Sequence, residues 1–155
     1  CTKQSEVRVG AFYSPTTAAF SPRSRAELIS AINACIKLTP EGHCSKKSYG
    51  PIGEWDVSSV TDMSRMFSYA NSFNGDTSKW DVSGVTTMAG MFDGAASFKS
   101  DLSNWDVSSV TDMSSMFSDA DSFNSDISKW TFDLWDQGSQ PVPQYALLSR
   151  VSSPS

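Results

Sequence analysis

Three consecutive stretches of 25 residues decide how this chain folds: WDVSSVTDMSRMFSYANSFNGDTSK at 55–79, WDVSGVTTMAGMFDGAASFKSDLSN at 80–104 and WDVSSVTDMSSMFSDADSFNSDISK at 105–129. Fourteen of the 25 columns are identical in all three copies, and all six methionines of the chain fall in two of these columns. A fixed period of this length is the signature of a repeat protein, in which each copy is one unit that stacks on the next.

Two spacings of apolar residues within one copy predict its local structure. Around each tryptophan the apolar residues alternate, as in Trp80-Asp81-Val82, which is typical of a half-buried strand. From Val60 onward they recur every three or four residues, which indicates a helical or 3₁₀ turn with one buried face. We therefore predict an α/β repeat solenoid of the leucine-rich-repeat type, with a short parallel sheet at the Trp-Asp-Val segments and helical turns behind it. The methionine pairs are expected to fill the core with the repeated phenylalanines rather than to form a pliable binding surface.

A stack of this kind needs a cap at each end. Ser24-Arg25-Ala26-Glu27 fits a capping box, and the apolar stripe that follows it predicts a helix near 25–38, which Pro40 and Gly42 end. The expected order is an extended N-terminal arm, a cap helix with a disulfide loop, three repeats, a C-terminal cap that starts a fourth copy, and an extended tail. These parts span 1–23, 24–54, 55–129, 130–136 and 137–155.

Composition bounds the classes of function. The net charge of −5 and the lack of a Lys/Arg cluster argue against nucleic-acid binding, and no apolar run is long enough to span a membrane. Cys35 and Cys44 flank a turn-like loop; a disulfide between them implies an oxidising compartment, whereas two free thiols would imply a reducing one. Cys1 is then an odd cysteine, either lipid-modified as in bacterial lipoproteins or simply the point at which the sequence starts.

The repeat resembles a known family. WDVSSVTDMSSMFSDADSFNSDISKW is similar to the BspA-like leucine-rich repeat of mycoplasma surface lipoproteins, and the lead-in from Ala26 to Gly53 resembles the one found before such repeats in algal proteins. The resemblance covers roughly 26–135. It implies a right-handed binding solenoid at a cell surface or in an exported protein, with no catalytic residues.

Two aspartate columns are candidate sites. Asp56, Asp81 and Asp106 are expected to stack outward, either as an acidic strip that docks Lys or Arg side chains of a partner, or held by nearby Ser and backbone groups and offset by Lys79 and Lys129. The second column, Asp76, Asp101 and Asp126, is interpreted as turn capping rather than as a calcium site, because each turn offers a single carboxylate.

Catalysis has little support in the sequence. His43 is the only histidine, and a Cys35-His43-Cys44 metal site would lack a fourth ligand. Every repeated Asp lies in a structural column, whereas a catalytic residue is needed once. We therefore expect no enzyme, no cofactor and no metal.

The expected function is a non-enzymatic protein-interaction module. The first hypothesis is a small extrinsic accessory subunit of a larger assembly, for example on the lumenal side of a photosynthetic membrane complex such as those of the thylakoid. The alternative is a secreted or lipid-anchored surface protein. Membrane association would then be peripheral, through a partner or a lipid on Cys1. Aromatic residues of the tails are the candidate anchors, namely Phe12, Tyr13 and Tyr145.

Overall fold

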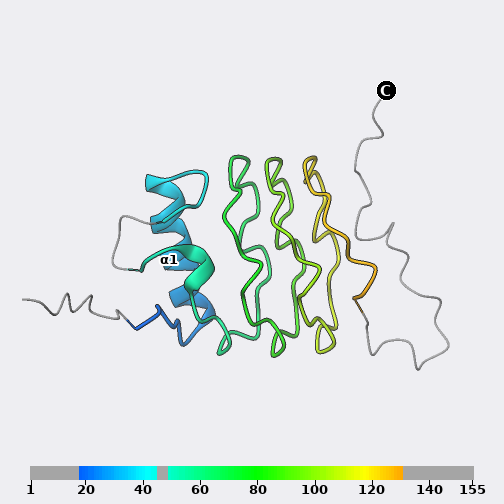
Figure 1. Ribbon diagram of the computed structural model, residues 1–155, viewed down its shortest axis with the longest axis horizontal. Helices are drawn as coiled ribbons and strands as arrows, with labels where there is room; N and C mark the ends of the chain where they lie inside the picture. The colour runs from blue at the N-terminus through cyan, green and yellow to red at the C-terminus, as the bar shows by residue number, and fades with distance from the viewer. Residues whose placement is uncertain (1–17, 45–48, 131–155) are drawn as a thin grey trace, which may run out of the picture.

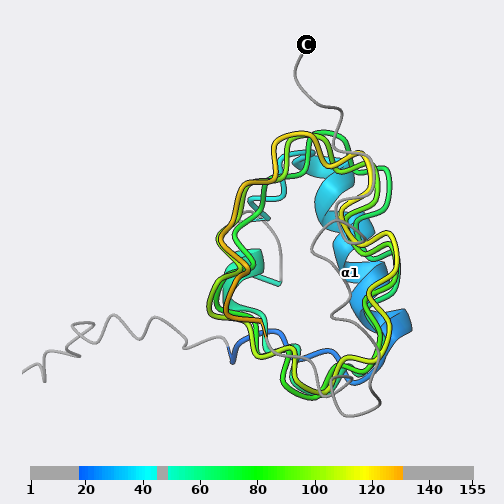
Figure 2. The same ribbon diagram turned by 90° about the vertical axis from the view of Figure 1, so that its right-hand side faces the viewer.

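The computed structural model describes residues 18–44 and 49–130. Within these ranges it has one α-helix, α1 (Arg25–Leu38), and one short 3₁₀ helix, η1 (Ile52–Glu54). The three repeat copies form coils of chain that lie side by side next to α1 (Figure 1). Seen along the stack, the coils superimpose around an elongated ring, and α1 follows one of its long sides (Figure 2). We refer to 55–79, 80–104 and 105–129 as the first, second and third coil.

The prediction of a parallel sheet at the Trp-Asp-Val segments is wrong for the described residues. They contain no strand, and two isolated parallel bridges, Asp62 to Thr87 and Thr87 to Asp112, are the nearest approach to one. The reason is local, because each segment runs straight into a turn in which the Val60 N–H donates to the Val57 carbonyl over 2.9 Å. The same turn recurs in the second and third coils, and in the first coil the Asp56 N–H donates to the Phe20 carbonyl of the N-terminal segment over 2.9 Å.

Bonds between coils lie on the segment that follows this turn. The N–H of every second residue from Met63 to Tyr69 donates to the carbonyl 24 residues further on, over 2.7 to 3.0 Å, and Met88 to Gly94 bond the second coil to the third in the same way. Two positions per coil have a left-handed backbone with φ between 53° and 71°. These are Arg65, Tyr69, Gly90, Gly94, Ser115 and Asp119. A chain that turns left-handed at these points can bond across coils without being an extended strand, which is why the coils stack without a sheet.

The core consists of the repeated apolar columns, as predicted. All six methionines are buried, and so are the tryptophans of the repeat. The phenylalanines form two stacked rows through the middle of the stack, with ring centroids 5.3 to 6.0 Å apart between coils and 3.9 to 4.1 Å apart within one coil. These rows are Phe67, Phe92 and Phe117, and Phe73, Phe98 and Phe123. Burial of each such side chain is worth about 1.5–3 kcal/mol, so the rows are a main source of stability.

Tryptophans of the repeat also fix the register between coils. The indole N–H of Trp80 donates to the backbone carbonyl of Ile52, 28 residues earlier in the preceding unit, over 2.8 Å, and that of Trp105 donates to Thr77 over 3.0 Å. Trp130 repeats this bond, whereas Trp55, at the start of the stack, donates to the nearby Gly50 carbonyl over 3.2 Å. A buried indole N–H requires an acceptor, so the bond is satisfied in only one alignment of neighbouring coils.

The cap helix lies where the sequence predicts it. α1 begins after Ser24, whose hydroxyl accepts the Glu27 N–H over 3.2 Å. The capping box is shifted by one residue, because the Glu27 carboxylate accepts the N–H of Arg23 over 2.9 Å rather than that of Ser24. α1 buries Leu28, Ala31, Ile32 and Cys35 against the first coil, which covers the apolar edge of the stack.

Candidate protein-interaction surfaces

The first candidate surface is the predicted Asp column. Asp56, Asp81 and Asp106 are all exposed, on successive coils. Each uses one carboxylate oxygen, Oδ1, to accept both the backbone N–H and the hydroxyl of the serine two residues later. The N–H bonds measure 3.1 to 3.2 Å and the hydroxyl bonds 2.6 to 2.7 Å. We call these three Asp-Ser units, with Ser58, Ser83 and Ser108, the Asp-Ser strip.

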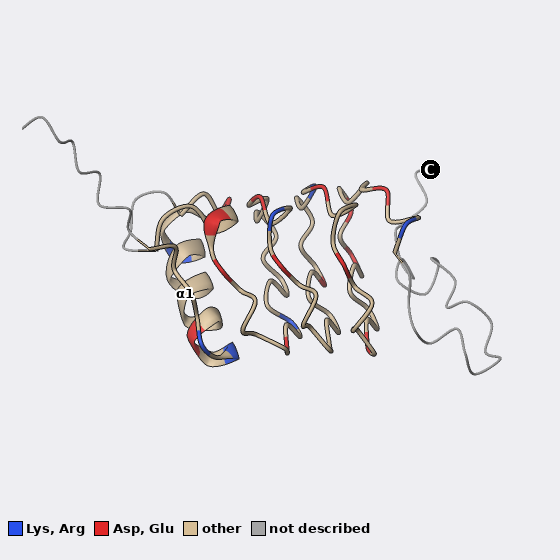
Figure 3. Ribbon diagram, turned by 60° about the horizontal axis from the view of Figure 1, so that its bottom comes forward, with Lys and Arg blue, Asp and Glu red and all other residues tan. Residues whose placement is uncertain are grey.

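The electrostatics of the strip follow from these bonds. The hydroxyl and then the N–H of the serine hold the pKa of Asp56 below its usual value, and the same two groups do so for Asp106. The prediction of local Ser and backbone bonds is therefore confirmed. The expected offset by lysine is not seen as ion pairs, since the one ion pair among the described residues joins Arg25 to Asp62 over 3.3 Å. Acidic residues recur from coil to coil, with few basic residues among them (Figure 3).

The second Asp column caps turns, as the sequence predicts. The Oδ1 atoms of Asp76, Asp101 and Asp126 accept the N–H of the serine two residues later, each over 3.0 Å. Serine hydroxyls from the following coil also donate to Asp76 and Asp101, over 3.4 and 3.0 Å. These bonds lower the pKa of all three carboxyl groups. Within 18–44 and 49–130, no group of three or more His, Cys, Asp or Glu side chains lies close enough to hold a metal ion.

Two open hollows lie beside the second Asp column, and the sequence analysis did not predict them. One, of about 260 Å³, lies between the cap and the first coil and is lined by His43, Glu54, Asp76 and Lys79 among others. The other, of about 520 Å³, lies between the second and third coils and is lined by Lys99, Asp101, Asp126 and Lys129 with Ser and Asn side chains. Both linings mix the two charge signs, and neither contains a Phe, Tyr or Trp side chain.

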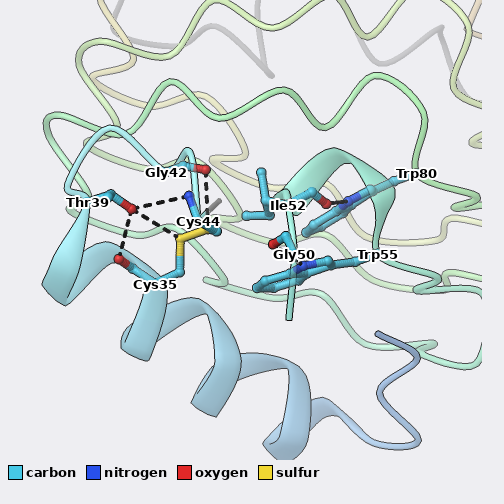
Figure 4. The surroundings of a disulfide bond; sticks show 8 residues. All are labelled: Cys35, Thr39, Gly42, Cys44, Gly50, Ile52, Trp55 and Trp80. Carbon is cyan, nitrogen blue, oxygen red and sulfur yellow. Dashed lines mark hydrogen bonds between the residues drawn. A yellow bond between two sulfur atoms is a disulfide. The ribbon is translucent and has the colours of Figure 1, made fainter. Parts of the chain in front are cut away.

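The predicted cysteine pair forms a disulfide. Cys35, in the last turn of α1, bonds to Cys44 with Cα atoms 5.1 Å apart, within the usual range. The Thr39 hydroxyl joins the same two residues, because it donates to the Cys35 carbonyl over 3.2 Å and accepts the Cys44 N–H over 3.3 Å (Figure 4). The disulfide is typical of an oxidising compartment. His43 is exposed beside it and takes no part in the bond.

The tail residues named as anchors, Phe12, Tyr13 and Tyr145, lie outside the described residues. Two exposed large side chains that the sequence analysis did not single out lie inside them: Leu38, 55% exposed at the end of α1, and Tyr69, 75% exposed on the first coil. The sequence does hold one indication of Tyr69: the other two copies have Gly94 and Asp119 at the same position of the repeat, so an aromatic residue there departs from the pattern. None of the helices in the described part of the chain has the length and apolar character needed to cross a membrane.

Stacked copies of a 25-residue unit, with a shared aromatic core and repeated polar surfaces, define the chain as a repeat protein. The model of the family described as "Mycoplasma protein of unknown function, DUF285" matches residues 41–140, and the chain belongs to this family. Neither a curated protein nor a solved structure matches the chain.

Proposed function

We propose that the chain is a non-enzymatic protein-interaction module, a short leucine-rich-repeat-like solenoid that acts as a scaffolding subunit. The observation that carries this proposal is the threefold repetition of the Asp-Ser strip at the same place on successive coils. Each carboxylate is oriented by two hydrogen bonds, and the coils beneath are locked by buried Trp and Phe columns. A polar surface held rigid before binding loses little conformational entropy when a partner docks.

The chemistry of the strip indicates its partner. Since Oδ1 of each Asp is used by its serine, the remaining oxygen, Oδ2, is the atom that faces a ligand; on Asp56 it accepts the Ser21 hydroxyl over 3.3 Å. Lys and Arg side chains donate to such oxygens in charge-assisted hydrogen bonds. A basic segment of a protein that lies along the stack would meet one carboxylate per coil. Binding of this kind weakens as salt screens the exposed charges.

The finer assignment rests on the resemblance to BspA-like repeats in their algal version and on the disulfide. It is an extrinsic accessory subunit of a larger assembly in an oxidising compartment, of which the lumenal side of a photosynthetic membrane complex is the example we favour. The alternative function is a secreted or surface-anchored binding protein, and the disulfide supports it equally.

Native size fractionation of source membranes, followed by mass spectrometry, tests the proposal. We expect the chain to co-migrate at fixed stoichiometry with a larger assembly, and a variant with Asp56→Asn, Asp81→Asn and Asp106→Asn to co-migrate less, most clearly at raised salt. Recovery on the outside of intact cells, where added protease removes it, would support the alternative. Migration of all of the protein at the chain's own mass of 16.8 kDa would contradict the subunit assignment.

A further inference from the structure

The first coil differs from the others at the two left-handed positions. In the repeat, Arg65 aligns with Gly90 and Ser115, and Tyr69 aligns with Gly94 and Asp119. The backbone φ is 55° at Arg65 and 59° at Tyr69, in the region that favours glycine. Bulky side chains are unfavourable there and persist only where the surrounding structure holds them. The second coil stacks with glycine at both positions. The first coil therefore has two residues with an unfavourable backbone conformation that stacking does not require.

Burial does not compensate for this cost. The side chain of Tyr69 is 75% exposed and that of Arg65 is exposed. Arg65 makes no ion pair among the described residues: Asp62 pairs with Arg25, and Asp93 of the second coil lies beside Arg65 without an ion pair. Arg65 therefore presents a guanidinium group with no carboxylate bound to it.

Both residues lie next to the second coil, and their backbone is bonded to it. The Arg65 N–H donates to the Ala89 carbonyl over 3.0 Å and the Tyr69 N–H to the Asp93 carbonyl over 2.7 Å, so both are tied to the second coil. Their side chains lean across the glycines of that coil. A Cβ added to Gly90 would lie 3.3 Å from Cγ of Arg65, and one added to Gly94 would lie 2.9 Å from Cδ1 of Tyr69.

We propose that Arg65 and Tyr69 form a second partner-binding surface, which accepts an extended protein segment that carries a carboxylate next to an apolar side chain. Arginine binds a carboxylate through two parallel hydrogen bonds, and tyrosine offers a rigid apolar ring with a polar tip. Both residue types are enriched among those that dominate binding energy. This inference rests on the proposed protein-binding role and adds a partner of opposite charge to that of the Asp-Ser strip.

A purely structural role for the pair makes a different prediction. The Tyr69 ring covers the backbone at Gly94, and a ring packed over glycine can stabilise a pairing between chain segments. If that were its whole role, replacement would lower the melting temperature and leave binding unchanged. The binding role predicts that replacement weakens binding with little change in melting temperature.

The test is a selection of random displayed peptides on the immobilised full-length protein. We expect the enriched peptides to carry Asp or Glu next to an apolar residue. A synthetic copy of the most enriched peptide should bind roughly tenfold or more weakly to a variant with Arg65→Ser and Tyr69→Asp. These are the residues that the third coil uses at the same positions, so the variant keeps a backbone that the chain itself shows to be compatible.

Two controls keep the outcomes distinct. Leu38→Ser removes the other large exposed hydrophobic side chain of the described residues and should leave peptide affinity unchanged. Arg65→Gln removes the charge while it keeps the side chain over Gly90, and should weaken binding even if the double variant folds poorly. Enriched peptides without acidic residues, no enrichment, or equal affinity for Arg65→Gln and wild type would overturn the inference. If only the Asp-to-Asn variant of the strip lost binding, this inference would fail while the proposed function stood.

Discussion

Thr77 occupies a column in which the other units have Ile52, Leu102 and Ile127, and its side chain is fully buried. Within the described part of the chain its hydroxyl oxygen has no hydrogen-bond partner. The backbone of Thr77 is fully used: its N–H donates to the Ser100 hydroxyl over 3.1 Å, and its carbonyl accepts the Trp105 indole over 3.0 Å. Thr77→Val replaces the hydroxyl by a methyl group of similar size and leaves both backbone bonds in place.

The expected effect of Thr77→Val is stabilisation. A buried polar group without a partner costs about 1–3 kcal/mol, and the methyl group that replaces it is favourably buried. We therefore expect the free energy of unfolding to rise by about 1–2 kcal/mol, which for a domain of this size corresponds to roughly 2–8 °C in melting temperature. Urea denaturation followed by tryptophan fluorescence measures the change, since the repeat tryptophans are buried in the fold.

Thr77→Ser is the matched control, because it keeps the hydroxyl and removes the methyl group. It should lower the free energy of unfolding by about 1 kcal/mol. A neutral or destabilising Thr77→Val would refute the reasoning, since it would mean that the hydroxyl makes a favourable hydrogen bond in solution, for example to a buried water.

Three further predictions concern the cap and the carboxylates. Gly42→Ala should destabilise the protein by about 2–4 kcal/mol, because φ is +84° and a Cβ would collide with the Phe73 ring. Gly50→Ala, with φ +65° and open space around it, should cost only about 1 kcal/mol, and equal effects of the two substitutions in urea denaturation would contradict this. Replacing Cys35 and Cys44 by Ala should lower the free energy of unfolding by about 2–3 kcal/mol relative to the oxidised protein, and an unchanged urea midpoint would show that the loop needs no cross-link. Serine hydroxyl and N–H groups lower the pKa of six carboxyl groups in the fold, those of Asp56, Asp76, Asp101, Asp106, Asp112 and Asp126. Their contribution to stability is therefore full above about pH 4–5 and is lost as the pH falls through the lowered values; a melting temperature that stays flat or rises from pH 5 to pH 2 would contradict that sign.

The parts of the fold that depend on burial could be predicted from the sequence. The helix at 25–38, the disulfide and the inward Trp, Val and Met columns were all predicted, because an apolar column that recurs every 25 residues has one plausible place in a stack. The outward Asp56, Asp81 and Asp106 follow from the same alternation. Their bonds to serine were one of two interpretations that the sequence left open, and the structure confirms those bonds.

The predicted sheet failed because alternation over Trp-Asp-Val is too short to distinguish a strand from a turn entry. The sequence analysis did not predict the left-handed backbone positions. Gly90 and Gly94 are residues typical of such positions, but the other copies have Arg65, Tyr69 and Ser115 in the same columns, which do not indicate a positive φ. The predicted capping-box bond from the Ser24 N–H to Glu27 differs from the observed one by one residue, because the Glu27 carboxylate can reach the N–H of either Arg23 or Ser24, and tertiary packing selects between them.

The central claim is that the face of the coils with the Asp-Ser strip contacts a protein partner. A photo-cross-linking residue at Ser109, which is exposed beside the strip, tests it most directly, with the same residue at Asn33 on the exposed side of α1 as control. After irradiation in the source compartment, the account predicts a discrete adduct of higher mass from position 109 and none from position 33. An intact assembly with no adduct from position 109, or equal adducts from both positions, would contradict it.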